Sequence, residues 1–135
     1  MKNPIKISYP AKYRDMKIGE LKKECMRVFE KKLSNKKVKN KNTGATILLT
    51  KNGAKHALFA RTGGFEKIIA VTIIDSIIRE AVFDKQMKST KKQYLFFMKY
   101  NCKVVVDKKE FTVSVFVGVK PGKNLEFYYD HVLIT

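Results

Sequence analysis

The last third of the chain carries the pattern that most restricts its fold: three β-rich runs at 93–106, 110–120 and 125–135, separated by short connections. In the middle run every second residue is apolar, namely Phe111, Val113, Val115, Val117 and Val119. This alternation is typical of a strand with one buried face. The connections are short enough for hairpins, so the three strands are predicted to form an antiparallel meander.

Apolar periodicity predicts two main helices earlier in the chain. From Ile18 to Leu33, apolar residues recur at steps of three and four. From Phe65 to Phe83 they cover a broad surface and leave a narrow polar stripe. Between these helices, a turn at 42–44 separates predicted strands at 37–41 and 45–50. Asn52 and Gly53 should end the second strand before a short helix at 54–60.

These elements predict a single α+β domain at 18–135, with helices on one face of an antiparallel sheet. Residues 1–17 hold two of the three prolines and are expected to be an irregular lead, and 84–92 is expected to be a polar connection. The two cysteines, Cys25 and Cys102, lie far apart in apolar surroundings and are predicted to be buried thiols rather than zinc ligands. No signal peptide or membrane-length apolar run is visible, which favours a cytoplasmic protein with no membrane partner.

The charge points to a polyanion as partner. The formal net charge is +17, from 29 Lys and Arg against 12 Asp and Glu, which exceeds what solubility requires of a small domain. The segment 31–65 has no acidic residue and nine basic ones: Lys31, Lys32, Lys36, Lys37, Lys39, Lys41, Lys51, Lys55 and Arg61. Clustering of one sign favours phosphate binding. A lysine-rich source or a solvated surface is the alternative explanation.

Both histidines are candidates for proton transfer, because the pKa of histidine lies near neutrality. His56 follows Lys55 within the acid-free segment. Cleavage of RNA by its own 2′-hydroxyl needs such a group, together with cations for the phosphorane charge, a role that suits Lys51, Lys55 and Arg61. His131 lies in the last predicted strand. By simple alternation it shares one face with Leu125, Phe127, Tyr129 and Leu133, so it fits the packed surface of a sheet equally well.

Other residues are candidates for contacts with nucleic acid. Lys99, Asn101 and Lys103 share one face of a predicted strand, and Thr112 and Ser114 could add hydroxyls to the same surface. Aromatic residues such as Tyr128 could stack on bases, although most should belong to the core. No cofactor or metal is expected, because the chain lacks the carboxylate cluster that two-metal nucleases use.

Several motifs together resemble a known family: NTGATILLT, GAKHALF, IIREAVF, KKEFTVSVFVGVK and NLEFYYDHVLIT. In this order they are similar to the third type of large polyvalent-protein-associated domain, found in phage and mobile-element proteins and grouped with the barnase, EndoU, colicin and RelE-like nucleases. The resemblance covers about 38–135. It implies N-terminal helices on an antiparallel sheet of about four strands and metal-independent cleavage of RNA.

Three functions follow from these observations. The first is a metal-independent ribonuclease of a phage or mobile element, acting as a toxin or effector. The second is a non-catalytic module that binds RNA or another nucleic acid, with strong salt dependence. The third is a protein-interaction module of a phage particle or conjugative apparatus. An immunity or phage protein is a further expected partner, and the chain is expected to be a monomer or weak dimer.

Overall fold

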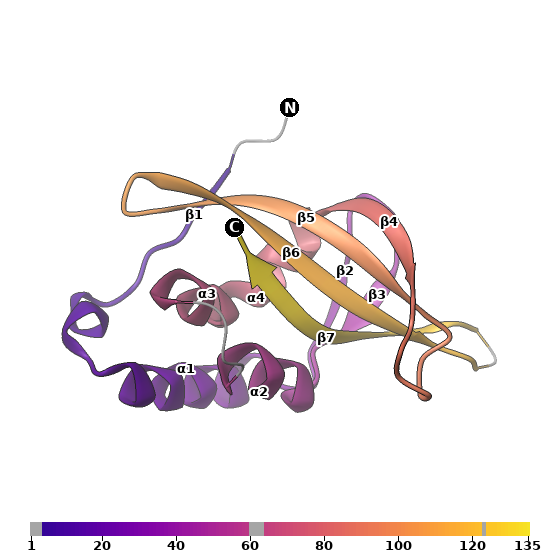
Figure 1. Ribbon diagram of the computed structural model, residues 1–135, viewed down its shortest axis with the longest axis horizontal. Helices are drawn as coiled ribbons and strands as arrows, with labels where there is room; N and C mark the ends of the chain where they lie inside the picture. Colours follow the sequence, from indigo (N-terminus) through magenta and orange to yellow (C-terminus); the bar gives the residue numbers. More distant parts are fainter. Residues whose placement is uncertain (1–3, 60–63, 123) are drawn as a thin grey trace.

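The computed structural model describes residues 4–59, 64–122 and 124–135 (Figure 1). The helices of this part are η1 (Ala11–Asp15), α1 (Ile18–Lys32), α2 (Lys51–Phe59), α3 (Phe65–Ala70), η2 (Val71–Ile73) and α4 (Ile74–Glu80), with η marking 3₁₀ turns. The strands are β1 (Ile5–Lys6), β2 (Lys37–Lys39), β3 (Thr46–Leu48), β4 (Val82–Lys88), β5 (Phe96–Val106), β6 (Lys109–Lys120) and β7 (Glu126–Ile134).

The described strands form one curled sheet of seven strands in the order β1-β5-β6-β7-β3-β2, and β4 pairs with β5. β5, β6 and β7 are antiparallel neighbours, so the predicted meander is confirmed. The β2–β3 hairpin joins β7 through parallel pairing of β3. The α+β class is confirmed, but the described sheet has more strands than the approximately four that the family resemblance implies.

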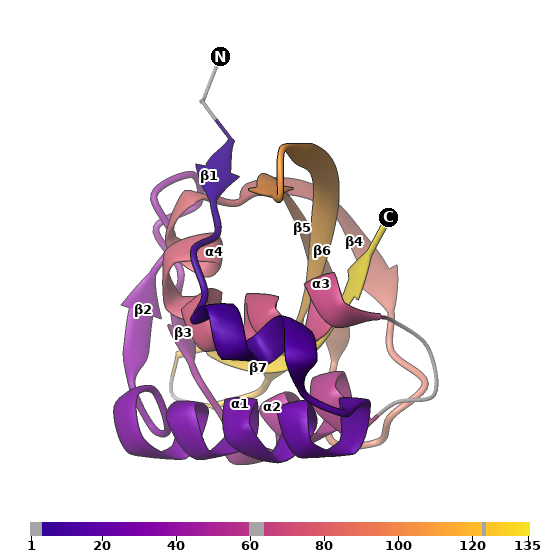
Figure 2. The same ribbon diagram turned by 90° about the vertical axis from the view of Figure 1, so that its left-hand side faces the viewer.

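The core lies between this sheet and the helices. The sheet curls around the segment that holds α3 and α4, and α1 and α2 lie together beyond it (Figure 2). Val113, Val115 and Val117 of β6 are fully buried in this core, which agrees with the alternation of the sequence. Cys25 and Cys102 are both buried, as predicted. Among the helices of the described residues, none is long and apolar enough to cross a membrane.

Two predicted segments have different boundaries. The long helix expected at 65–83 is interrupted by η2 and ends at Glu80. It ends there because the amide nitrogen of the buried Asn40 side chain donates hydrogen bonds to the carbonyls of Ile78 and Ala81, both at 2.8 Å. Residues 84–88 of the connection expected at 84–92 instead belong to β4, an edge strand that already begins at Val82. Its alternation is hard to read because most of its side chains are polar and exposed.

The expected irregular lead also carries structure in its described part, 4–17. β1 pairs in parallel with β5 at Val104 and Val105. Ile7 and Tyr13 are buried in the core. Apolar contacts with the rest of the domain therefore fix a segment that has no sequence periodicity.

Helix α2 begins at Lys51, three residues before the predicted start. The hydroxyl of Thr50 accepts a hydrogen bond from the backbone N–H of Gly53 at 3.0 Å and donates one to the carbonyl of Tyr129 at 2.8 Å. This cap starts the helix and ties it to β7. Gly53 allows a close approach, because a Cβ there would lie 2.3 Å from the carbonyl oxygen of Tyr129.

We therefore expect Gly53→Ala to lower the free energy of unfolding by about 1–3 kcal/mol, since the backbone of β7 must shift. Gly19→Ala in α1 is the matched control: a Cβ there has no described atom within 4 Å. Alanine at that position should leave stability unchanged or raise it by about 0.5 kcal/mol. Urea denaturation measures both, and equal stability of the two variants would contradict the tight contact.

Candidate functional site

A bulge in β7 creates the candidate site. β6 pairs Phe116 with His131 and Val117 with Tyr129, so Asp130 is an extra residue between two regular pairs. Tyr129 and Val132 both point into the core although they are three residues apart. The prediction that His131 shares a face with Tyr129 is therefore wrong. Simple alternation cannot anticipate an inserted residue.

His131 lies on the outer face of the sheet, opposite the core. Its ring stacks on Phe116 with centroids 4.4 Å apart and planes at 8°. Its Nδ1 atom lies 2.6 Å from Oδ2 of Asp130. A carboxylate so close to Nδ1 holds a proton on that atom and fixes the orientation of the ring.

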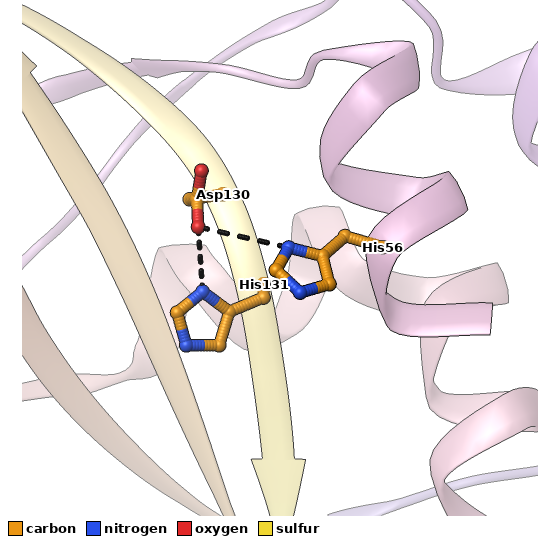
Figure 3. Close-up of side chains that lie close together, drawn as sticks. All are labelled: His56, Asp130 and His131. Carbon is orange, nitrogen blue, oxygen red and sulfur yellow. Dashed lines mark hydrogen bonds and ion pairs between the residues drawn. The ribbon is translucent and has the colours of Figure 1, made fainter. Parts of the chain in front are cut away.

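Asp130 is the centre of the site. Its side chain is only 7% exposed, and its carboxylate accepts hydrogen bonds from the ammonium of Lys91 at 2.9 and 3.0 Å. His56 approaches from α2, with Nδ1 3.9 Å from Oδ2 (Figure 3). The two histidine rings have centroids 5.1 Å apart. We call His56, Asp130 and His131 the histidine cluster.

A cleft of about 360 Å³ opens beside this cluster. We call it the histidine cleft; its lining includes His56, Lys91, Tyr94, Lys120, Tyr128 and Asp130. His56 is about half exposed, with 48% of its side chain accessible, whereas the side chain of His131 is 26% accessible and does not line this cleft. Of the two histidines, His56 is therefore the one that presents a ring to the cleft.

Electrostatics distinguish the groups of the cleft. Partial burial, and then repulsion from His131 and Lys91, lower the pKa of His56 below its ordinary value, against an opposing attraction to Asp130. Burial opposes ionisation of Asp130, but hydrogen bonds from His131 and Lys91 outweigh it and lower its pKa. Burial and the nearby carboxylate of Asp130 raise the pKa of Tyr94. At neutral pH the cleft therefore holds a neutral His56, an ionised Asp130 and a protonated Tyr94.

The lowered pKa of His56 can be tested by NMR, because the chain has only two histidines. His56→Ala assigns the two ring signals. We expect the His56 signal to titrate with a midpoint below about 6.5. Lys91→Ala should raise that midpoint, because it removes a repulsive charge and frees Asp130 to attract the imidazolium. The neighbouring exposed Lys92→Ala serves as control and should leave the midpoint in place; equal shifts in both variants would contradict the assignment.

Of the residues singled out in the sequence, the structure brings His56, His131 and Tyr128 together. Tyr128 lines the histidine cleft, and the ammonium of Lys120 lies 4.6 Å from the centre of its ring. Lys51 and Lys55 are exposed on α2, where Lys51 forms an ion pair with Glu30 at 3.3 Å.

The other candidates lie apart from the histidine cleft. Lys41 forms an ion pair with Glu80, at the end of α4. Lys103 pairs with Glu110 at 3.1 Å. Lys99 pairs with Asp84 at 3.4 Å and is the cross-strand neighbour of Phe116. Arg61 falls outside the described residues.

The surface predicted around Lys99 exists. In the register of β5 and β6, Asn101 faces Ser114 and Lys103 faces Thr112. The hydroxyl of Ser114 donates a hydrogen bond to the side chain of Asn101 at 2.8 Å. These residues share the outer face of the sheet with Phe116 and His131, whereas the role of that face in binding stays a prediction.

Sequence reasoning missed Asp130, Lys91 and Lys120, whereas Tyr94 belongs to the aromatic residues considered for stacking on bases. Asp130 lies 74 positions after His56, so no local spacing joins them. One signal was present: Asp130 is one of only 12 acidic residues and lies in an aromatic strand directly before a histidine. Lys91 belongs to a lysine-rich connection, in which no single lysine stands out.

The histidine cluster also has the donor set of a metal site. One ligand atom from each of its three residues lies within 4.8 Å of the others. Two imidazoles and a carboxylate suit Zn²⁺, with a fourth position left for water. The ammonium of Lys91, however, contacts both oxygens of Asp130, where a cation would bind.

Comparison with known proteins identifies a family. Searches of curated proteins and of solved structures gave no significant match. A family model, described as large polyvalent protein-associated domain 3, matches residues 16–129. The matched range includes His56, Lys91 and Tyr128 and ends one residue before Asp130. Because the match covers most of its length, the chain belongs to the family of large polyvalent protein-associated domain 3.

Proposed function

We propose that this domain is a metal-independent ribonuclease of a phage or mobile element, which cleaves RNA by attack of a ribose 2′-hydroxyl on the adjacent phosphate. The observation that carries the proposal is His56, neutral and half exposed in a cationic cleft, beside an ionised Asp130 that is nearly buried. The resemblance to barnase-like and RelE-like nucleases supports the same reaction class.

In this proposal, His56 takes the proton of the attacking 2′-hydroxyl. A general base works best when it is unprotonated at the working pH, and its lowered pKa meets that condition. Because Nδ1 of His56 faces Asp130, its Nε2 atom would accept the proton. Tyr94 lines the same cleft and keeps its phenolic proton, so its hydroxyl is the proposed donor to the leaving 5′-oxygen.

Lys91 and Lys120 supply positive charge to the phosphate. Both line the histidine cleft, and charge that grows on the phosphorane oxygens is stabilised by cations already in position. His131 is a positioning residue in this scheme. It holds the carboxylate of Asp130 through Nδ1, and Asp130 in turn orients His56 and Lys91.

Lys91 also favours a reaction without a metal. A divalent cation at Asp130 would have to displace an ammonium that makes two hydrogen bonds at 2.9 and 3.0 Å. Cleavage should therefore persist in excess chelator. Added Zn²⁺ should inhibit it by competing for the histidine cluster.

The experiment that tests this function incubates the protein with end-labelled single-stranded RNA and transfer RNA, with chelator present. Products with 2′,3′-cyclic phosphate ends are expected. The matched control is the same RNA with one 2′-deoxynucleotide at a mapped cleavage position, because that substrate lacks the attacking group. Intact RNA under all conditions, or cleavage of the deoxy substrate at that position, would end the proposal.

A non-catalytic nucleic-acid-binding module is the second candidate. It is favoured by one observation: His131 does not line the histidine cleft, so a single imidazole is presented there. This function predicts salt-sensitive binding of RNA without cleavage. The same incubation, followed by a gel-shift measurement at two salt concentrations, separates the two functions.

A further inference from the structure

Two more hollows continue from the histidine cleft across the sheet. The first has a volume of about 290 Å³; its lining includes Lys37, Leu48, Leu125, Glu126 and Tyr128. We call it the aromatic cleft, and it shares Tyr128 with the histidine cleft. The second hollow, the basic groove, has a volume of about 470 Å³. Its lining includes Lys37, Lys39, Lys41 and Arg79, so it shares Lys37 with the aromatic cleft.

Strand register explains why the hollows are continuous. Lys37 of β2 pairs with Leu48 of β3, and Leu48 pairs with Tyr128 of β7. Cross-strand partners point to the same face of a sheet, so these three side chains form one row. The row spans two strand spacings, or about 10 Å. Tyr128 and Lys37 therefore mark the two ends of the aromatic cleft.

The chemistry changes along this path. The histidine cleft and the basic groove are rich in cations, whereas the aromatic cleft presents the ring of Tyr128 and the half-exposed side chain of Leu125. It also holds the carboxylate of Glu126, which accepts a hydrogen bond from the hydroxyl of Tyr128 at 3.2 Å. A phosphate would be repelled beside Glu126, but a base could stack there. Cations beside an aromatic surface are the combination with which proteins bind single strands, because the cations follow the backbone while the aromatic ring stacks on a base.

We propose that one single-stranded RNA occupies the histidine cleft, the aromatic cleft and the basic groove in a continuous path. The scissile phosphate lies at His56, a neighbouring base stacks on Tyr128, and a later phosphate reaches Lys37, Lys39 and Arg79. A duplex does not fit this path, because its bases are already stacked on one another. The inference rests on the proposed function for the choice of RNA, and it adds a binding surface away from the bond that is cleaved.

The test measures binding of 2′-O-methyl RNA, which cannot be cleaved, by fluorescence anisotropy with oligonucleotides of about two to ten nucleotides. Lys37→Ala/Lys39→Ala should weaken binding of the long oligonucleotides by about tenfold and leave the shortest unaffected. The slope of log affinity against log salt should shrink by about 1.4, since each phosphate contact to a single strand contributes about 0.7. Glu126→Gln should strengthen binding, because it removes a like charge from the path.

Lys23→Ala is the matched control, because Lys23 is an exposed lysine of α1 away from all three hollows. It should change affinity less than twofold. The inference is overturned if the double variant behaves like Lys23→Ala, if it weakens short and long oligonucleotides equally, or if a duplex of the same length binds as well. Failure of the proposed function looks different: the parent would bind in this length-dependent way but leave ordinary RNA intact.

Discussion

Replacing His56 by alanine should reduce RNA cleavage by a factor of about 10²–10⁴, the contribution typical of a positioned proton-transfer group. The free energy of unfolding should change little, because about half of the side chain is exposed and its contact with Asp130, at 3.9 Å, is long. Single-turnover cleavage of labelled RNA measures the first effect and urea denaturation the second.

The pH dependence of RNA cleavage tests the role of His56 as general base more directly. Cleavage by the parent should rise with pH through a midpoint below about 6.5, as the base loses its proton. This rise with pH should disappear in His56→Ala. Tyr94→Phe should keep the rise but lower the rate of cleavage at every pH. If His56→Ala cleaves at the parent rate and still shows the rise, another group transfers the proton.

Asp130→Asn should cause the largest loss of stability among single changes in the site, about 1–3 kcal/mol at neutral pH. The amide has nearly the same shape as the carboxylate. The amide is uncharged and has a single acceptor oxygen, so it cannot accept hydrogen bonds from both Lys91 and His131 as the carboxylate does. Activity should fall as well, because these contacts hold the cleft together. Urea denaturation of parent and variant across pH measures the effect.

The sign of the pH effect follows from the lowered pKa of Asp130. A carboxyl group whose pKa is lower in the folded state contributes stability above its unfolded-state value, about 3.9, and loses it as pH falls through the folded-state value. The difference between parent and Asp130→Asn should therefore be full at pH 7 and shrink in acid. Lys92→Ala, beside Lys91 but exposed, should match the parent throughout. A difference that persists at low pH would show that Asp130 acts through packing alone.

Much of the fold could be predicted from local patterns. The alternation of β6, the amphipathic face of α1 and the turn at 42–44 are properties of neighbouring residues, and each appears as predicted. Boundaries failed where distant groups decide them. Asn40 ends α4 through contacts 38 and 41 residues away, and Thr50 starts α2 through the carbonyl of Tyr129.

Only part of the candidate site could be predicted from the sequence, because its residues also come from segments that are distant in the chain. His56 stood out because it lies among cations without an acid nearby in sequence. Its acidic neighbour, Asp130, lies in the last strand, in a bulge that no pattern of residues in the sequence predicts. The cations of the cleft, Lys91 and Lys120, come from a loop and a strand end, where lysine is common in this chain.

The inserted residue in β7, Asp130, contributes a side chain to the candidate site but takes no part in the regular pairing of the strands. Without Asp130, Tyr129 would be followed directly by His131, and the ladder of Val117–Tyr129 and Phe116–His131 would run on without interruption. The pairing of β6 with β7 therefore does not need this residue, and a relative one residue shorter here could keep the same strand pairing while lacking the carboxylate. A comparison of family members should therefore record the length of the last strand as well as its residues, because the loss of one residue there would remove the carboxylate from the candidate site.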